Sequence, residues 1–203
     1  MSGGQLGALL AGIALLILAA GCDDAAEPQK AGIMIRHKSA GDVLQVVHGD
    51  TLAGAELDGI SLDGADLANQ NMTRASLRRT HLQSADLRRA NLESADLEGA
   101  RLTAADLSGA NLAHAKLQAA DLANANLAGA TLTDADATNT NMGLADLRGA
   151  HLEGADLQRS DLTTAKMEGA TYDAKTHWPL TFDPKPHGAR LIAPSASPRT
   201  RPK

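Results

Sequence analysis

The chain has 203 residues, a formal net charge of −5, one cysteine and three aromatic residues. A single cysteine excludes an internal disulfide framework. An acidic chain with so few aromatic rings for base stacking also disfavours nucleic-acid binding.

The amino-terminal residues 1–21 carry no charged side chain, and residues 6–20 form an apolar run. The run is shorter than the roughly 20 residues of a membrane span, and it fits the apolar part of a secretory signal. It ends in Leu18-Ala19-Ala20-Gly21-Cys22, which resembles the lipobox of bacterial lipoproteins. The resemblance implies cleavage before Cys22 and acyl chains on it, so that membrane lipid is a partner and the protein faces the periplasm or the outside. The alternative is a plain signal peptide or short anchor in which the cysteine is incidental.

A short polar tether, residues 22–32, leads into residues 33–50. Two apolar, β-branched runs, residues 33–38 and 42–47, flank a Ser-Ala-Gly loop. This pattern predicts a β-hairpin. We expect it to cover the open end of the structure that follows, because exposed strand edges and apolar ends of repeat structures are normally blocked. A short helix over residues 41–48 is the alternative.

Residues 51–170 repeat with a period of five. Of the 24 positions from 52 to 167 in steps of five, 20 are Leu, three are Met and one is Ala137. Ala fills 18 of the 23 positions two residues before them, from 55 to 165, and Asp or Asn usually comes directly before the Leu. A helix would spread such leucines around its axis, and a flat strand would alternate their faces. A chain that bends once per pentad points every Leu inward, with Gly easing the bends at Gly99, Gly109, Gly129, Gly149 and Gly169.

Runs such as ADLAN, ADLRR, ANLES and ADLSG resemble the pentapeptide-repeat family. The resemblance implies an all-β fold: a right-handed quadrilateral β-helix of four pentads per coil, here about six coils. Residues 20 apart then stack. The expected inner column includes Leu67, Leu87, Leu107, Leu127 and Leu147. Ala137 interrupts a Leu column and predicts a locally thin core.

Stacking at 20 residues also groups the other positions. Four of the five sites that break the Ala pattern share one column, namely Ile60, Thr80, Thr140 and Ser160. Asn71, Asn91 and Asn111 predict an amide ladder. An outward acidic column, which we expect to be solvated, is the best candidate for an interaction surface: Asp66, Asp86, Asp106 and Asp146.

All three aromatic residues, Tyr172, Trp178 and Phe182, lie in residues 171–184. This segment resembles the A-x-Y-x-x-x-T-x-W-P-x-x-F-D-P ending of many pentapeptide-repeat proteins. We expect a cap over the last coil, with a ligand-binding aromatic site as the alternative. Residues 185–203 are rich in proline and basic residues and predict a disordered basic tail.

Candidate chemistry is sparse. The seven histidines are dispersed without metal-ligand spacing, so we expect no metal or cofactor, and no motif for a catalytic nucleophile or phosphate loop occurs. A positive region on the early coils is either a solvated surface or a phosphate or lipid-headgroup contact, and it comprises Arg74, Arg78, Arg79, Arg88 and Arg89.

Two functions from different classes follow. The first is a non-enzymatic, membrane-anchored scaffold that binds an unknown protein outside the cytoplasm. The second is a cytoplasmic DNA mimic, because some pentapeptide-repeat proteins bind DNA gyrase and confer quinolone resistance. Residues 51–170 carry 17 acidic and 10 basic side chains, a modest excess for a DNA mimic. Self-association of an apolar end into a homodimer stays open.

Overall fold

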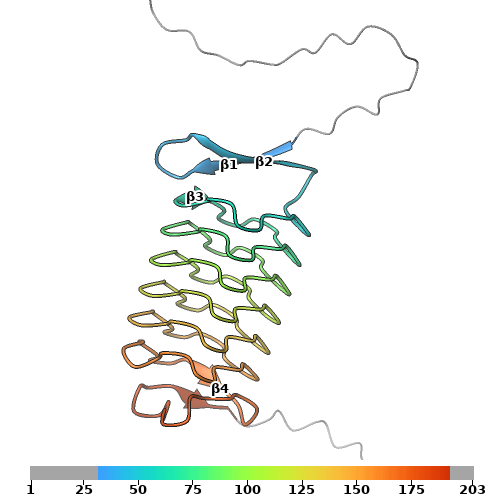
Figure 1. Ribbon diagram of the computed structural model, residues 1–203. Helices are drawn as coiled ribbons and strands as arrows, with labels where there is room; N and C mark the ends of the chain where they lie inside the picture. Colours follow the sequence, from blue (N-terminus) through green and yellow to red (C-terminus); the bar gives the residue numbers. More distant parts are fainter. Residues whose placement is uncertain (1–31, 193–203) are drawn as a thin grey trace, which may run out of the picture.

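A computed structural model describes residues 32–192, and all of its regular structure is β (Figure 1). The strands are β1 (Gly32–His37), β2 (Val43–His48), β3 (Ala65–Asp66), β4 (Thr171–Tyr172) and β5 (Arg190–Leu191). Between β3 and β4 the chain winds in stacked coils, with the β1–β2 hairpin at one end and β4 and β5 at the other (Figure 1).

Parallel β-bridges join the coils at intervals of 20 residues, for example Asp86 to Asp106 and Asn91 to Asn111. Each bridge rests on a repeated pair of hydrogen bonds. The Leu87 N–H donates to the Asp106 carbonyl at 2.7 Å, and the Asp106 N–H donates to the Ala85 carbonyl at 2.9 Å. Four pentads therefore make one turn, which explains how a period of five satisfies the backbone.

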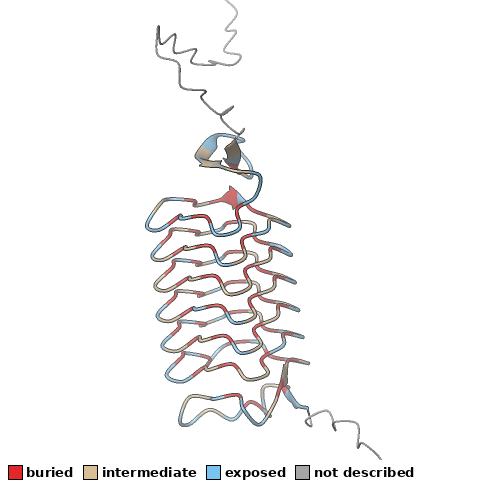
Figure 2. Cartoon of the chain, turned by 90° about the vertical axis from the view of Figure 1, so that its right-hand side faces the viewer, coloured by how far each residue is buried: buried red, intermediate tan, exposed pale blue. Residues whose placement is uncertain are grey.

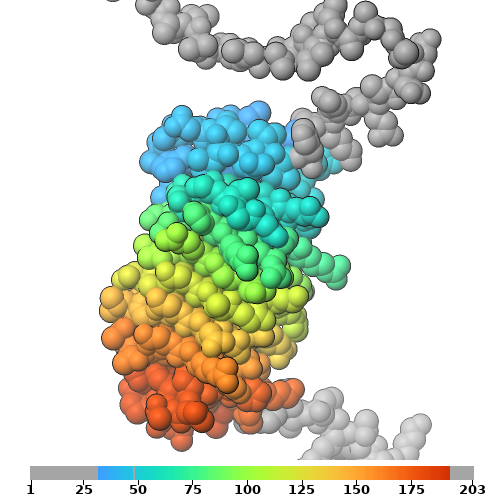
Figure 3. All heavy atoms as spheres, viewed as in Figure 1, coloured from blue at the N-terminus to red at the C-terminus, as the bar shows by residue number. Residues whose placement is uncertain are grey.

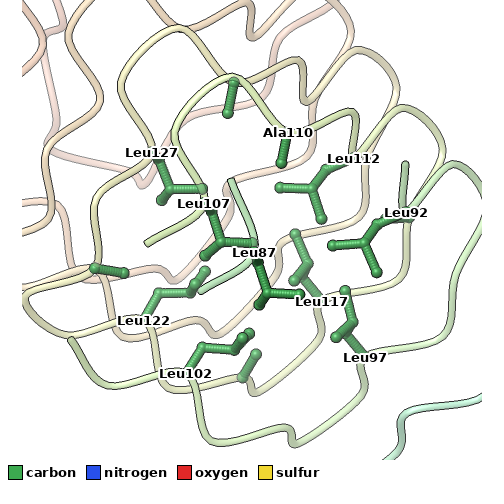
Figure 4. Close-up of a cluster of buried hydrophobic side chains, with 14 of the residues drawn as sticks. Leu87, Leu92, Leu97, Leu102, Leu107, Ala110, Leu112, Leu117, Leu122 and Leu127 are labelled. Atoms are coloured by element: carbon green, nitrogen blue, oxygen red, sulfur yellow. The ribbon is translucent and has the colours of Figure 1, made fainter. Parts of the chain in front are cut away.

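The core is a column of leucine and alanine side chains along the axis of the coils. Figure 2 shows buried residues recurring along every coil, and Figure 4 shows leucines of successive coils pointing into the same interior. Every leucine at the repeat positions is at most 1% exposed, including the five of the expected inner column: Leu67, Leu87, Leu107, Leu127 and Leu147. Ala137 occupies the same kind of position and is fully buried without filling the volume of a leucine.

The bends lie two residues after each central Leu, where most residues adopt a left-handed backbone. The predicted glycines do so, with φ between 65° and 76° at Gly109, Gly129, Gly149 and Gly169 among others. Within residues 32–192, fourteen non-glycine residues also have positive φ, including Arg89 at 55° and Leu144 at 60°. This geometry disfavours side chains, but the coil-to-coil hydrogen bonds impose it; the Arg89 N–H donates to the Ser108 carbonyl at 3.0 Å.

Hydrogen bonds from hydroxyl groups explain three of the four residues that replace Ala in one column, Thr80, Thr140 and Ser160. Thr80 Oγ1 donates to the Leu57 carbonyl at 2.6 Å. Two hydroxyls meet at the Ala137 carbonyl, Thr140 Oγ1 at 2.8 Å and Ser160 Oγ at 2.6 Å, and they lie 2.9 Å from each other. All three hydroxyl side chains are buried, so these bonds satisfy groups that water does not reach.

The first described segment is an antiparallel hairpin, not the alternative helix. Ile33 pairs with Val47 and Met34 with Val46, and the register shifts between Ile35 and Arg36. β1 also pairs with β3 of the first coil, giving the strand order β2-β1-β3. Ile35 is 2% exposed, so the inner face of the hairpin joins the leucine core.

The predicted disordered tail begins too early. After the left-handed Gly188, β5 pairs in parallel with β4, and the Arg190 N–H donates to the Ala170 carbonyl at 2.7 Å. Ala189 is buried there, and the Ile192 N–H donates to the Tyr172 carbonyl at 2.8 Å. The basic and proline-rich composition obscured this short pairing segment. Residues 193–203 lie outside the described part of the chain.

Candidate functional surface

The residue before each central leucine forms outward columns and also supports the bends. Its side-chain oxygen accepts a hydrogen bond from the backbone N–H two residues later. The Ser108 N–H donates to Asp106 Oδ1 at 3.0 Å, and the Ala113 N–H donates to Asn111 Oδ1 at 3.1 Å. Asp and Asn suit this position because a short side-chain acceptor can close such a local turn. The preference for Asp and Asn before leucine thus has a structural cause in the coil itself.

Two members of the candidate acidic column are bound by arginines. The Arg88 guanidinium donates to both Asp86 oxygens, at 2.8 and 2.6 Å, and Arg148 does the same to Asp146. The hydrogen bonds from the arginine side chains hold the pKa of both carboxyls below the usual value. Their side chains are only 13% and 19% exposed, which corrects the expectation of a fully solvated acidic column.

The remaining members of this column differ in surroundings. Asp66 is exposed and accepts the Ala68 N–H at 3.3 Å. Asp106 is partly buried and accepts a bond from Asn126 Nδ2 at 3.1 Å. The β-bridges 66–86, 86–106, 106–126 and 126–146 therefore bring the four aspartates into one line. The carboxylates of Asp86 and Asp146 are paired with arginines, whereas no arginine pairs with those of Asp66 and Asp106 among the described ion pairs.

The predicted amide ladder is present at one rung. Asn111 Nδ2 donates to Asn91 Oδ1 at 3.1 Å. Similar rungs join Asn126 to Asp106 and Asn141 to Asp121, so amide donors bond to carboxylates of the adjacent coil in two other columns. Each such donor relieves the repulsion between acceptors stacked one coil apart.

The arginines of the early coils lie at different bends. Arg78 bonds to Asp96 at 3.4 Å and to Glu98 at 2.7 Å, in a network that also brings Lys116 within 3.8 Å of Asp96. Arg88 and Arg89 border a surface hollow of about 380 Å³ with Asn69 and Ser108. A second hollow of about 270 Å³ is bordered by Asp58, Gly59, Arg78 and Arg79.

At the far end the aromatic side chains pack in a row. The ring centroids of Tyr172 and Trp178 lie 5.3 Å apart, edge to face, and those of Trp178 and Phe182 lie 5.5 Å apart, stacked. His187 extends the row at 4.7 Å from Phe182. Tyr172 is buried, whereas Trp178 and Phe182 are partly buried against the core. The sequence did not indicate His187 as a member of this row.

Cys22, the candidate lipidation site, lies outside the described residues. Within residues 32–192 no cluster of His, Cys, Asp or Glu side chains has the arrangement of a metal site. No helical segment in that range has the length and hydropathy of a membrane span.

A comparison with curated proteins found no match. A pentapeptide repeat protein from the thylakoid lumen of Arabidopsis thaliana is 34% identical over 50% of this chain and 68% of that chain, with a TM-score of 0.40. HetL from Nostoc sp. strain PCC 7120, involved in heterocyst differentiation regulation, is 25% identical over 71% and 87%, with a TM-score of 0.39. QnrB1, a plasmid-mediated fluoroquinolone resistance protein, is 19% identical over 69% and 78%, with a TM-score of 0.33.

The sequence signature covers more than half of the chain. Pentapeptide repeats match residues 51–89, 71–109, 105–143 and 141–171, with eight copies. The matched ranges coincide with the coils whose backbone bridges recur every 20 residues. The chain belongs to the pentapeptide-repeat family.

Proposed function

We propose that this protein is a non-enzymatic, membrane-anchored lipoprotein that serves as a rigid scaffold for another protein outside the cytoplasm. The observation that carries the scaffold role is the ladder of bridges at intervals of 20 residues, which fixes outward side chains in straight columns. The anchor rests on the apolar run that ends at Cys22. Several acyl chains on one cysteine give durable attachment, where one chain is marginal.

The coils supply a rigid surface. The central leucines have almost no exposure, and adjacent coils share hydrogen bonds of 2.7 to 3.1 Å at nearly every pentad. In our proposal about six right-handed coils form the rod, the hairpin of residues 33–50 closes one end and the aromatic segment 171–184 closes the other. Figure 3 shows the coils following one another along the rod, so a partner that lies along it contacts several coils at once.

The acidic column remains our candidate for the partner surface. Asp86 and Asp146 are neutralised by Arg88 and Arg148, so the recognisable negative charge lies at Asp66 and Asp106. A partner with basic groups spaced two coils apart matches this pattern. Charge pairs at such a surface set orientation and association rate more than affinity.

Membrane fractionation tests the anchor. Wild-type protein is expected in the membrane fraction and a Cys22→Ser variant in the soluble fraction. Membrane partition that is unchanged by Cys22→Ser contradicts the anchor.

Crosslinking in cells followed by mass spectrometry tests the partner surface. We expect Asp66→Lys combined with Asp106→Lys to remove crosslinked partners. The matched control combines Asp136→Lys with Asp156→Lys. It makes the same two charge reversals in another outward column, which lies two pentads away around the coil. Equal loss in both double variants contradicts a specific role of the acidic column.

The DNA-mimic hypothesis makes a different prediction. It requires a dense negative surface, whereas arginines pair with Asp86, Asp146 and Asp96 along these coils. Purified protein is therefore expected to leave DNA supercoiling by gyrase unchanged, with and without a quinolone. Inhibition or protection of gyrase in that assay supports the DNA-mimic function instead.

A further inference from the structure

The outer face of the β1–β2 hairpin carries apolar side chains that have no role in the core. Alternation along β1 places Ile33 and Ile35 against the coils and turns Met34 away. Met34 is 55% exposed, and Val46, its cross-strand partner, is 45% exposed. Val43, opposite Arg36, is also 45% exposed. We call these three residues, Met34, Val43 and Val46, the outer hairpin face.

The position of this face distinguishes it from the rest of the surface. Large apolar side chains with high exposure in residues 32–192 are few, and most lie at the two ends of the rod: the outer hairpin face at one end, Leu180, Leu191 and Ile192 at the other. Only Leu144 among them projects from the coils between. The hairpin is also the described element nearest to Cys22 in the sequence, because β1 begins at Gly32.

The chain length to Cys22 is short. Residues 23–31 separate Cys22 from the first residue of β1, and fully extended they reach about 30 Å at roughly 3.3–3.6 Å per residue. An acyl anchor at Cys22 thus keeps the hairpin within a few tens of ångströms of the lipid. At such an effective concentration even a small apolar face stays in contact with its target.

One cation accompanies the apolar side chains. Arg36 lies on the same side of β1 as Met34, and its guanidinium contacts the Met34 sulfur at 3.4 Å and donates to the Gly41 carbonyl at 3.0 Å. An arginine held beside apolar side chains matches the boundary between acyl chains and anionic headgroups. Lys38, in contrast, turns back to the coils and bonds to the Ser84 carbonyl.

We propose that the outer hairpin face rests on the membrane surface, so that the rod stands on its amino-terminal end and presents its sides and aromatic end to partners. This inference rests on the proposed lipid anchor, but it concerns a separate contact. The anchor alone permits any orientation of the rod. The hairpin contact fixes one.

Site-directed spin labelling tests the contact. Lipidation blocks Cys22, so Val46→Cys offers a single thiol for a nitroxide in the full-length mature protein on phosphatidylethanolamine–phosphatidylglycerol vesicles. We expect vesicles to raise the accessibility of this nitroxide to oxygen and to lower its accessibility to an aqueous nickel complex. Nitroxides at Leu144→Cys and Leu180→Cys, on the side and at the far end, are the matched controls and stay accessible to nickel.

Two further measurements separate the outcomes. Mass spectrometry of the amino-terminal peptide reports the anchor independently. Protein held on zinc-chelating lipid by an amino-terminal histidine tag, with Cys22 replaced by Ser, tests the hairpin without acylation and without nickel at the membrane surface. Val46 labels that remain as accessible to nickel as those at Leu180 overturn the inference while leaving the anchor intact. Protection that appears without vesicles and grows with protein concentration also overturns it, because the occupant is then a second copy of the chain.

Discussion

Asp86 and Arg88, two residues apart and separated by a buried leucine, form a bidentate ion pair on the outside of the coil. The Arg88 Nε and one terminal nitrogen lie 2.8 and 2.6 Å from the two carboxylate oxygens, and the Arg88 backbone N–H donates to the same carboxylate at 3.2 Å. The pair repeats at Asp146 and Arg148, three coils further on. A motif of the form Asp-Leu-Arg therefore neutralises its own carboxylate.

The first prediction concerns the pH dependence of this pair. The hydrogen bonds from Arg88 lower the pKa of Asp86 below its ordinary value, so the pair stabilises the fold above the unfolded-state pKa. That contribution is lost as the pH falls through the folded pKa. Arg88→Ala is expected to raise the Asp86 pKa toward its ordinary value and to change the stability at neutral pH only slightly, because Arg88 is exposed and solvent screens the pair. Carboxyl NMR titration measures the pKa directly. Arg89→Ala, at the adjacent bend, is the control and leaves the Asp86 titration unchanged.

The second prediction concerns the two hydroxyls that share the Ala137 carbonyl. Thr140→Val or Ser160→Ala alone leaves one donor in place, whereas the double variant leaves a buried carbonyl without either hydroxyl. The double variant is expected to lose roughly 1–3 kcal/mol of unfolding free energy, more than the two single losses together. Urea denaturation of the four proteins in the cycle measures the coupling. Strictly additive losses contradict a shared acceptor.

The third prediction tests the inward direction of the central leucines. Leu107 is fully buried, so Leu107→Asp places an unpaired carboxylate in the core and is expected to abolish cooperative folding. Leu144→Asp, at a side chain that is 59% exposed, is the matched control and retains the β-type circular dichroism spectrum. A normal melting transition for Leu107→Asp would refute the burial of this column.

The fourth prediction isolates the backbone of the bends. An added Cβ at Gly129 meets no atom within 4 Å, so Gly129→Ala changes only the strain at φ 65° and is expected to cost about 1 kcal/mol. Ala119, at φ 56° in another bend, offers the reverse change, and Ala119→Gly is expected to be neutral or stabilising. Thermal denaturation compares the pair. Losses of the same size in both variants show that something other than left-handed strain controls these bends.

The sequence predicted the parts of this structure that repeat. A period of five cannot be met by a helix or a flat strand, so it predicts inward leucines and one bend per pentad without any tertiary information. The stacking of residues 20 apart was implied by the resemblance to the pentapeptide-repeat family, and the β-bridges confirm it. The comparison of columns also grouped Thr80, Thr140 and Ser160 together, although only the structure shows the carbonyls that their hydroxyls bind.

The features that sequence reasoning missed are those that do not repeat. Whether Arg88 folds over Asp86 depends on the rotamer of a long exposed side chain, which periodicity does not determine. The pairing of β5 with β4 involves a two-residue strand inside a basic, proline-rich segment, where composition favours disorder. His187 joins the aromatic row because that segment folds back.

The amino terminus of the mature protein tests the central claim of the proposed function most directly. Mass spectrometry of protein extracted from its native membrane is predicted to find a first peptide that begins at Cys22 and carries the added mass of acyl chains. A first peptide that begins at Met1, or an unmodified Cys22, would contradict the lipid-anchored account.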